Sequence, residues 1–160
     1  NIIPQKVGIM GFSAGGHLAS TALTHYNRAV IDSEGVSLRP DFGMLVYPVI
    51  SMRDEWGHRG SRDALLGENA EKMQQTLYSS YLQVSAETPP VFLVHSTDDK
   101  AVPVQNSLAF YQQLVAHDVP AEMHIYETGG HGYGMGRQGT SSTSWPGRCR
   151  EWLQLRGLLD

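Results

Sequence analysis

The stretch GIMGFSAGGHLAS, residues 8–20, joins an apolar run to a segment of small residues, with a serine between them. The run at residues 7–10 ends at a glycine and predicts a short buried strand, and helical spacing of apolar residues follows from 14 to about 26. Residues 11–15 read G-F-S-A-G and match the pattern G-x-S-x-G. Between a strand and a helix, this pattern predicts a tight turn that presents the hydroxyl of Ser13 to a pocket.

Glycines flank this serine for a steric reason. Backbone segments approach each other closely in such a turn, so side chains at Gly11 and Gly15 are expected to clash. The N–H of Ala14, at the start of the helix, is expected to point where an oxyanion would form. The stretch therefore predicts a nucleophile at Ser13 and one oxyanion-hole donor at Ala14.

The rest of the chain alternates predicted strands and helices. Three more strands are indicated by apolar runs at 42–46, 91–94 and 122–126, and two more helices by apolar spacing at 103–117 and from Ser144 onward. This alternation predicts an α/β fold, a single domain over 1–160 with about four parallel strands flanked by helices. Residues 51–88 depart from the alternation, and we expect them to form short helical pieces over the active-site end.

Composition and charge restrict the partners. The chain has 12 Lys and Arg against 16 Asp and Glu, with no basic run, so a nucleic-acid partner is not expected. No apolar stretch approaches the roughly 18 residues of a membrane span. Cys149 is the single cysteine, so no internal disulfide is possible, and the compartment, cytoplasmic or secreted, stays open. The seven histidines lack metal-binding spacing, so we expect neither a metal nor a cofactor.

A serine nucleophile needs a general base, and the base needs an orienting carboxylate. With a G-x-S-x-G turn these follow in the order serine, acid, histidine, and catalytic groups gather at the carboxyl ends of the strands. The segment ETGGHGYGMG after the last predicted strand offers His131 as the base, in a glycine-rich loop. The segment HSTDDKAVP after the strand at 91–94 offers two candidate acids, Asp98 and Asp99.

Three segments, GFSAGGHLA, HSTDDKAVPV and GGHGYGMG, together resemble the carbohydrate-esterase-like branch of the α/β-hydrolases, which includes acetyl xylan esterases. The pattern of that branch, H-G-x-x-D-x-x-V-P, aligns with His95, Val102 and Pro103 and places the acid at Asp99. Ser96 stands where the family usually has glycine. The resemblance thus selects Asp99 and leaves Asp98 as a solvated or loop-capping carboxylate.

The resemblance implies a partial α/β-hydrolase fold and a serine hydrolase of short-chain carboxylic esters. Acetyl groups on sugars or hemicellulose are the implied substrates, cleaved through a triad of Ser13, Asp99 and His131 and an acyl-enzyme. Two alternatives stay open: a serine peptidase of the prolyl-oligopeptidase type, and a non-enzymatic binding module. The presence of all three triad residues argues against the binding module.

Other polar and aromatic residues have structural interpretations. We expect His17 to pack behind the serine turn and His95 to fix its own loop. Two interpretations stay open for His58, Arg59 and Arg62, which either bind polar groups of a substrate or form a solvated surface. Cys149, Trp145 and Trp152 are expected to be packing residues.

Enzymes of this family have several strands before the serine turn, and a loop after one of them supplies the second oxyanion donor. Only about ten residues precede the turn here, so we expect the carboxyl half of the fold, lacking its amino-terminal strands. The strand at 7–10 is then expected to expose an apolar edge and to favour homo-oligomers. The missing second oxyanion donor is expected to leave esterase activity weak. The polar character of 51–88 predicts faster cleavage of acetate than of octanoate esters.

Overall fold

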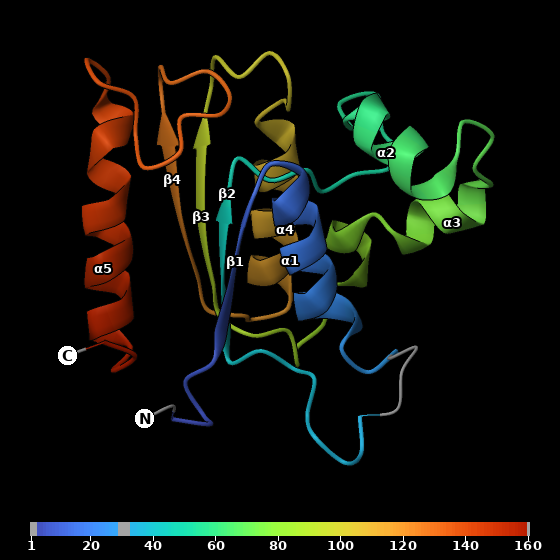
Figure 1. Cartoon of the computed structure of the whole chain (residues 1–160), viewed down its shortest axis with the longest axis horizontal. Helices are drawn as coiled ribbons and strands as arrows, with labels where there is room; N and C mark the ends of the chain where they lie inside the picture. The colour runs from blue at the N-terminus through green and yellow to red at the C-terminus, as the bar shows by residue number, and fades with distance from the viewer. Residues whose placement is uncertain (1–2, 29–32, 160) are drawn as a thin grey trace.

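The computed structural model describes residues 3–28 and 33–159, and its central feature is a parallel sheet (Figure 1). The strands lie in the order β1-β2-β3-β4, with bounds β1 (Gly8–Phe12), β2 (Phe42–Val46), β3 (Val91–Ser96) and β4 (Ala121–Tyr126). The helices are α1 (Ala14–His25), α2 (Arg59–Leu66), α3 (Lys72–Leu77), α4 (Gln105–Ala116) and α5 (Trp145–Leu155), with short 3-10 helices at Ser80–Gln83 and Ser141–Ser144.

Helices cover both faces of the sheet: α1 and α4 lie on one side and α5 on the other (Figure 1). Alternate strand residues point to opposite faces. Leu45 and Leu93 therefore pack in the α1–α4 core, and Val46 and Val94 in the core beneath α5. The second core is rich in aromatic side chains, including Phe92, Tyr133, Trp145 and Trp152.

The four parallel strands and the flanking helices confirm the α/β architecture expected from the sequence. Strand β1 is longer than expected and continues to Phe12, so that Ser13 follows it directly. Helix α5 begins directly after Ser144, close to the expected start, but the Ser144 side chain does not cap it. The Ser144 hydroxyl donates to the Ser141 carbonyl instead, because a 3-10 helix leads straight into α5.

Residues 51–88 form α2, α3 and a 3-10 helix on the outer side of α1 (Figure 1). Two histidines of α1 contact backbone carbonyls at the end of α3. His17 Nε2 lies 2.7 Å from the Tyr78 oxygen and His25 Nε2 lies 3.0 Å from the Leu77 oxygen. The segment is thereby fixed to α1, and His17 is packed as the sequence predicted.

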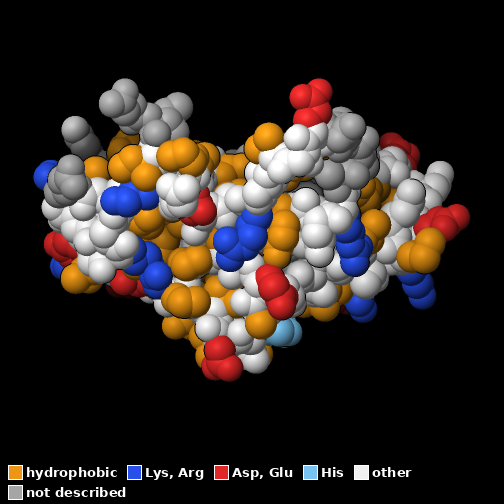
Figure 2. Space-filling model, turned by 90° about the horizontal axis from the view of Figure 1, so that it is seen from below, with side chains coloured by type: hydrophobic (Ala, Val, Ile, Leu, Met, Phe, Trp, Pro, Cys, Tyr) orange, Lys and Arg blue, Asp and Glu red, His pale blue; other side chains and the backbone are white. Residues whose placement is uncertain are grey.

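Strand β1 lies at one edge of the sheet, beside exposed apolar side chains of Val7 and Met10. Self-association through this edge stays a prediction. Seen from the amino ends of the strands, the surface mixes basic, acidic and apolar side chains without one dominant basic area (Figure 2). Within residues 3–28 and 33–159, no helix has the length and apolar character that a bilayer crossing requires.

Candidate active site

The turn at Ser13 has the strained backbone that its sequence pattern predicts. Ser13 has φ 54° and ψ −121°, a conformation that L-residues rarely adopt. The turn is held from both sides, since the Ser13 N–H donates to the Val46 carbonyl and the Ser13 carbonyl accepts from the Val49 N–H. These bonds to the end of β2 stabilise the strained turn between β1 and α1.

The two glycines of the motif differ in their surroundings. A side chain at Gly11 would collide with the carbonyl oxygen of Gly15 and meet Ala19, so Gly11 is required as expected. A Cβ at Gly15 would meet no heavy atom within 4 Å among the described residues apart from its chain neighbours and the backbone of α1, so the expected clash there is wrong. The crowded second position is Gly16, whose Cβ would lie 2.6 Å from Pro48 Cβ.

We therefore expect alanine at Gly11 and at Gly15 to have opposite effects on stability. Gly11→Ala should lower the free energy of unfolding by about 1–3 kcal/mol, because backbone must move to admit the methyl group. Gly15→Ala should raise it by roughly 0.5–1 kcal/mol, because alanine is the better helix former in α1. Urea unfolding of the two variants checks this, and equal effects would contradict it.

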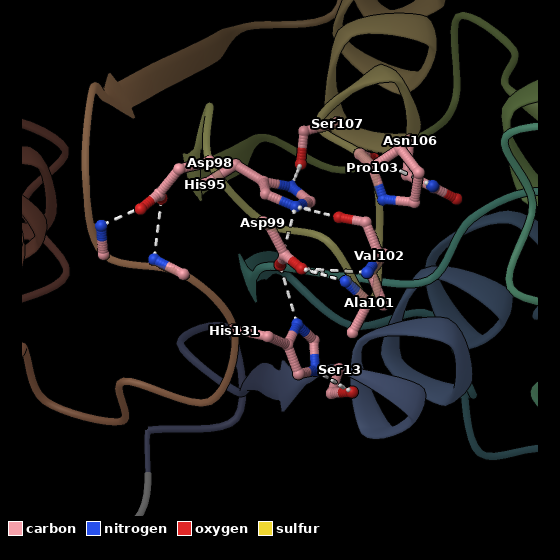
Figure 3. Close-up of polar contacts among 12 residues, drawn as sticks. Ser13, His95, Asp98, Asp99, Ala101, Val102, Pro103, Asn106, Ser107 and His131 are labelled. Atoms are coloured by element: carbon pink, nitrogen blue, oxygen red, sulfur yellow. Dashed lines mark hydrogen bonds and ion pairs between the residues drawn. The ribbon is translucent and has the colours of Figure 1, made fainter.

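Ser13, His131 and Asp99 form one hydrogen-bonded row (Figure 3). Ser13 Oγ lies 2.8 Å from His131 Nε2, and His131 Nδ1 lies 2.7 Å from Asp99 Oδ2. Because a carboxylate only accepts, Nδ1 carries the proton and Nε2 is free to accept from the serine. The three side chains come from the β1–α1 turn, the loop after β4 and the loop after β3, and the hydrogen-bond geometry expected from the sequence is present.

Asp99 is a buried carboxylate with several donors. Its Oδ1 accepts the N–H groups of Ala101 and Val102 at 3.0 and 2.9 Å. Burial raises the pKa of Asp99, but hydrogen bonds from His95, Val102 and His131 outweigh it and lower the pKa to about 2. The group is therefore ionised at neutral pH, as an orienting carboxylate must be.

This lowered pKa predicts a stability contribution that depends on pH. The unfolded chain has an aspartate pKa of about 3.9, so the contribution is full above that value and disappears as pH falls toward 2. The stability difference between the parent and Asp99→Asn should shrink by about 2 kcal/mol between pH 6 and pH 2. Urea unfolding at both pH values measures it, and a constant difference would contradict it.

Asp98 faces a different partner from its neighbour. Its Oδ1 accepts the N–H groups of Gly129 and Gly130 at 3.0 and 2.7 Å, which lie just before His131 (Figure 3). Asp98 therefore anchors the loop that carries the histidine and does not touch the imidazole. This agrees with the loop-capping interpretation of Asp98 from the sequence.

Residues 2–145 match the family model described as the prolyl oligopeptidase family. The chain belongs to the prolyl oligopeptidase family. An acetylxylan esterase of Xylanibacter ruminicola is 37% identical over 140 residues, which are 85% of this chain and 28% of that protein. The endo-1,4-beta-xylanase B of Butyrivibrio fibrisolvens is 35% identical over 135 residues, 82% of this chain and 21% of that protein.

Among solved structures, this prolyl oligopeptidase family member is similar to an acetyl ester-xyloside bifunctional hydrolase from Caldicellulosiruptor lactoaceticus. The TM-score is 0.93 with 44% identity, over 99% of this chain and 60% of that chain. A carboxylesterase from Lactobacillus plantarum shares the fold at a TM-score of 0.77 and 23% identity, over 99% of this chain and 62% of that one. The chain thus spans less than a third of the two curated relatives and about three fifths of these structures.

Tyr47 lies in the candidate active site and was not predicted from the sequence. It follows β2 with φ 38°, and its ring packs edge-on against His131 with centroids 4.9 Å apart. Its hydroxyl accepts the N–H of Gly134 at 3.0 Å. Tyr47 therefore supports the loop that carries His131. In the sequence, Tyr47 is marked only as a bulky residue before Pro48 at the end of an apolar run.

An apolar cavity of about 610 Å³ lies between α1 and the 51–88 segment and reaches Ala14. Leu18 of α1 faces Met52, Ala64 and Leu65 across it. The polar composition of 51–88 did not predict an apolar cavity at this place. Its apolar residues are scattered along the sequence and meet only when α2 folds against α1.

The remaining polar candidates have structural partners. His58 Nδ1 accepts the Ser61 N–H and caps α2, while Arg59 and Arg62 both pair with Asp63. Cys149 is buried against Met44, and burial raises the pKa of its thiol to about 11. Trp145 and Trp152 are buried in the core beneath α5. No group of three or more His, Cys, Asp or Glu side chains suited to a metal ion occurs in the described part of the chain.

Proposed function

We propose that this chain carries the catalytic residues of a serine carboxylic ester hydrolase that removes short acyl groups, acetyl above all, from sugars. The observation that carries the proposal is the row Ser13–His131–Asp99, with contacts of 2.8 and 2.7 Å at the carboxyl ends of the strands. The esterase names of its relatives support the ester bond, and two of those names, acetylxylan esterase and acetyl ester-xyloside hydrolase, support an acetylated sugar.

The proposed chemistry is acyl transfer to water. His131 Nε2 takes the proton of Ser13 Oγ as that oxygen attacks the ester carbonyl, and Asp99 stabilises the imidazolium that forms. The oxyanion accepts the N–H of Ala14, which has no acceptor within the first turn of α1. Collapse breaks the ester bond, and His131 returns its proton to the leaving alcohol oxygen. Water, deprotonated by His131, then releases the acid and restores Ser13.

A fluorophosphonate probe and a substrate panel test the proposal. The probe should label Ser13 of the intact protein, with the peptide containing Ser13 found by mass spectrometry. Acetylated xylo-oligosaccharides and p-nitrophenyl acetate should both be hydrolysed. Labelling of Ser13 without hydrolysis of either ester would contradict the substrate class, and failure of labelling would contradict the nucleophile.

The family match favours a second candidate, a serine peptidase of the prolyl-oligopeptidase type. The same row of side chains suits amide hydrolysis, because both reactions pass through a tetrahedral oxyanion. A chromogenic peptide with proline before the scissile bond separates the two. Turnover of that peptide above turnover of the acetyl ester would replace the esterase proposal.

The length of the acyl group is tested by p-nitrophenyl acetate against octanoate. We expect acetate to be cleaved faster, in keeping with the acetyl esters named for the relatives. The cavity beside Ala14 is the feature with room for a longer chain. Faster turnover of octanoate would therefore assign the cavity to the acyl group and overturn the acetyl preference.

A further inference from the structure

His95 lies behind Asp99, on the side away from His131 (Figure 3). The His95 side chain is fully buried at the end of β3, and its Nε2 lies 3.3 Å from Asp99 Oδ2. That oxygen is the same atom that lies 2.7 Å from His131 Nδ1. One carboxylate oxygen therefore faces two imidazole rings, one buried and one next to the candidate nucleophile.

The partners of His95 fix which of its nitrogens carries the proton. Nε2 faces two acceptors, Asp99 Oδ2 and the Val102 carbonyl oxygen at 2.9 Å, so Nε2 is the protonated atom. Nδ1 lies 2.8 Å from the hydroxyl of Ser107 on α4, which donates to it. The ring is held on both sides in the core: its Nε2 N–H donates to the Val102 carbonyl, and Asp99 Oδ2 lies beside the same nitrogen.

We infer that His95 is a positioning residue of the candidate triad, whose protonated Nε2 lies against Asp99 Oδ2 and keeps that carboxylate aimed at His131. The inference rests on the proposed function, since it assigns His95 a part in the reaction of Ser13. Asp99 Oδ1 is fixed by two backbone N–H groups, whereas His95 and His131 are the side chains at Oδ2. Without His95, His131 would be the one remaining side chain of this pair that interacts with the negative charge on Asp99 Oδ2.

The loss should change the pH profile as well as the rate. A carboxylate with one donor fewer holds the imidazolium form of His131 more firmly. The acidic limb of the kcat/KM profile, which requires the neutral base, then moves to higher pH. A role confined to packing would lower the rate equally at every pH and leave the limb in place.

The test compares His95→Leu with His95→Gln in the intact protein, with p-nitrophenyl acetate as substrate. His95→Leu removes the donor and should lower kcat about 10- to 100-fold with little change in KM, with the acidic limb shifted upward. His95→Gln keeps an N–H donor and should restore most of kcat and the parent limb. Equal loss in both variants, or a loss without a shifted limb, would overturn the inference.

His25 supplies a matched control. Its Nδ1 lies 2.8 Å from the Thr24 hydroxyl and its Nε2 lies 3.0 Å from the Leu77 carbonyl, so it repeats the pattern of His95 without a carboxylate. His25→Leu removes the same bonds from α1, away from Asp99, and should leave the acidic limb unchanged. A limb that moves in this variant too would show that the shift does not come from Asp99, and would overturn the inference.

Two further measurements keep the test decisive. If His95→Leu does not fold, Ser107→Ala keeps the ring but removes its second anchor, and it should lower kcat about two- to tenfold at unchanged KM. Unchanged kcat in Ser107→Ala would count against the inference.

Acid unfolding does not depend on turnover: His95→Leu should lose stability at higher pH than the parent, because Asp99 lacks one donor. An inactive parent would contradict the proposed function, whereas an unshifted acid transition would contradict the role of His95.

Discussion

Replacing Ser13 with alanine should lower ester turnover by about 10⁴- to 10⁶-fold while the fold stays intact. The reason is that the Ser13 hydroxyl, 2.8 Å from His131 Nε2, is the one proposed to form the acyl-enzyme. Alanine keeps the Cβ of the turn, and the turn is held by backbone bonds to Val46 and Val49 that do not use the side chain. Steady-state kinetics with p-nitrophenyl acetate and urea unfolding measure the two halves of this result.

An exposed serine provides the control for this variant. Ser141→Ala, on the 3-10 helix before α5, removes an exposed hydroxyl outside the row of Ser13, His131 and Asp99 and should leave turnover within experimental error. Fluorophosphonate labelling should disappear in Ser13→Ala and persist in Ser141→Ala. Residual turnover within tenfold of the parent in Ser13→Ala would show that another group is the nucleophile.

The sequence predicted those parts of the site that depend on local pattern. The turn at Ser13 is encoded by adjacent residues, and His131 could be found because strand ends in a parallel sheet share one edge. The choice between Asp98 and Asp99 could not be made from local pattern, because both follow β3 in one loop. It depended on a family pattern, and in the structure one carboxylate binds a loop backbone while the other binds the imidazole.

The contacts that sequence reasoning missed join elements far apart in the chain. Tyr47 reaches Gly134 and His131, 87 and 84 positions along the chain, and nothing near Tyr47 in the sequence encodes those partners. The apolar cavity has the same origin, since its walls come from α1 and α2. Gly15 shows a different kind of error. The motif predicted a steric clash for a side chain at this position, and the structure shows open space there.

Asp99→Asn should lower kcat by about 10⁴-fold, whereas Asp98→Asn should cost about tenfold or less. In Asp99→Asn the amide oxygen can still accept from Ala101 and Val102, which leaves the NH₂ group facing His131 Nδ1. Nδ1 must then accept, so the proton moves to Nε2 and the ring can no longer take the proton of Ser13. In Asp98→Asn the amide oxygen still accepts the loop N–H groups that the carboxylate held, so the loop that carries His131 stays anchored.

The adjacent pair therefore separates orientation of the base from anchoring of its loop. Both variants lose one negative charge within one loop, so a general electrostatic effect on turnover would be similar in the two. A large difference in kcat with little difference in KM assigns the orienting role to Asp99, because only its substitution changes the proton position on His131. Equal losses, or a larger loss in Asp98→Asn, would mean that the loop rather than the carboxylate–imidazole bond limits the reaction. The 2.7 Å contact between Asp99 Oδ2 and His131 Nδ1 is the observation from which the first outcome is expected.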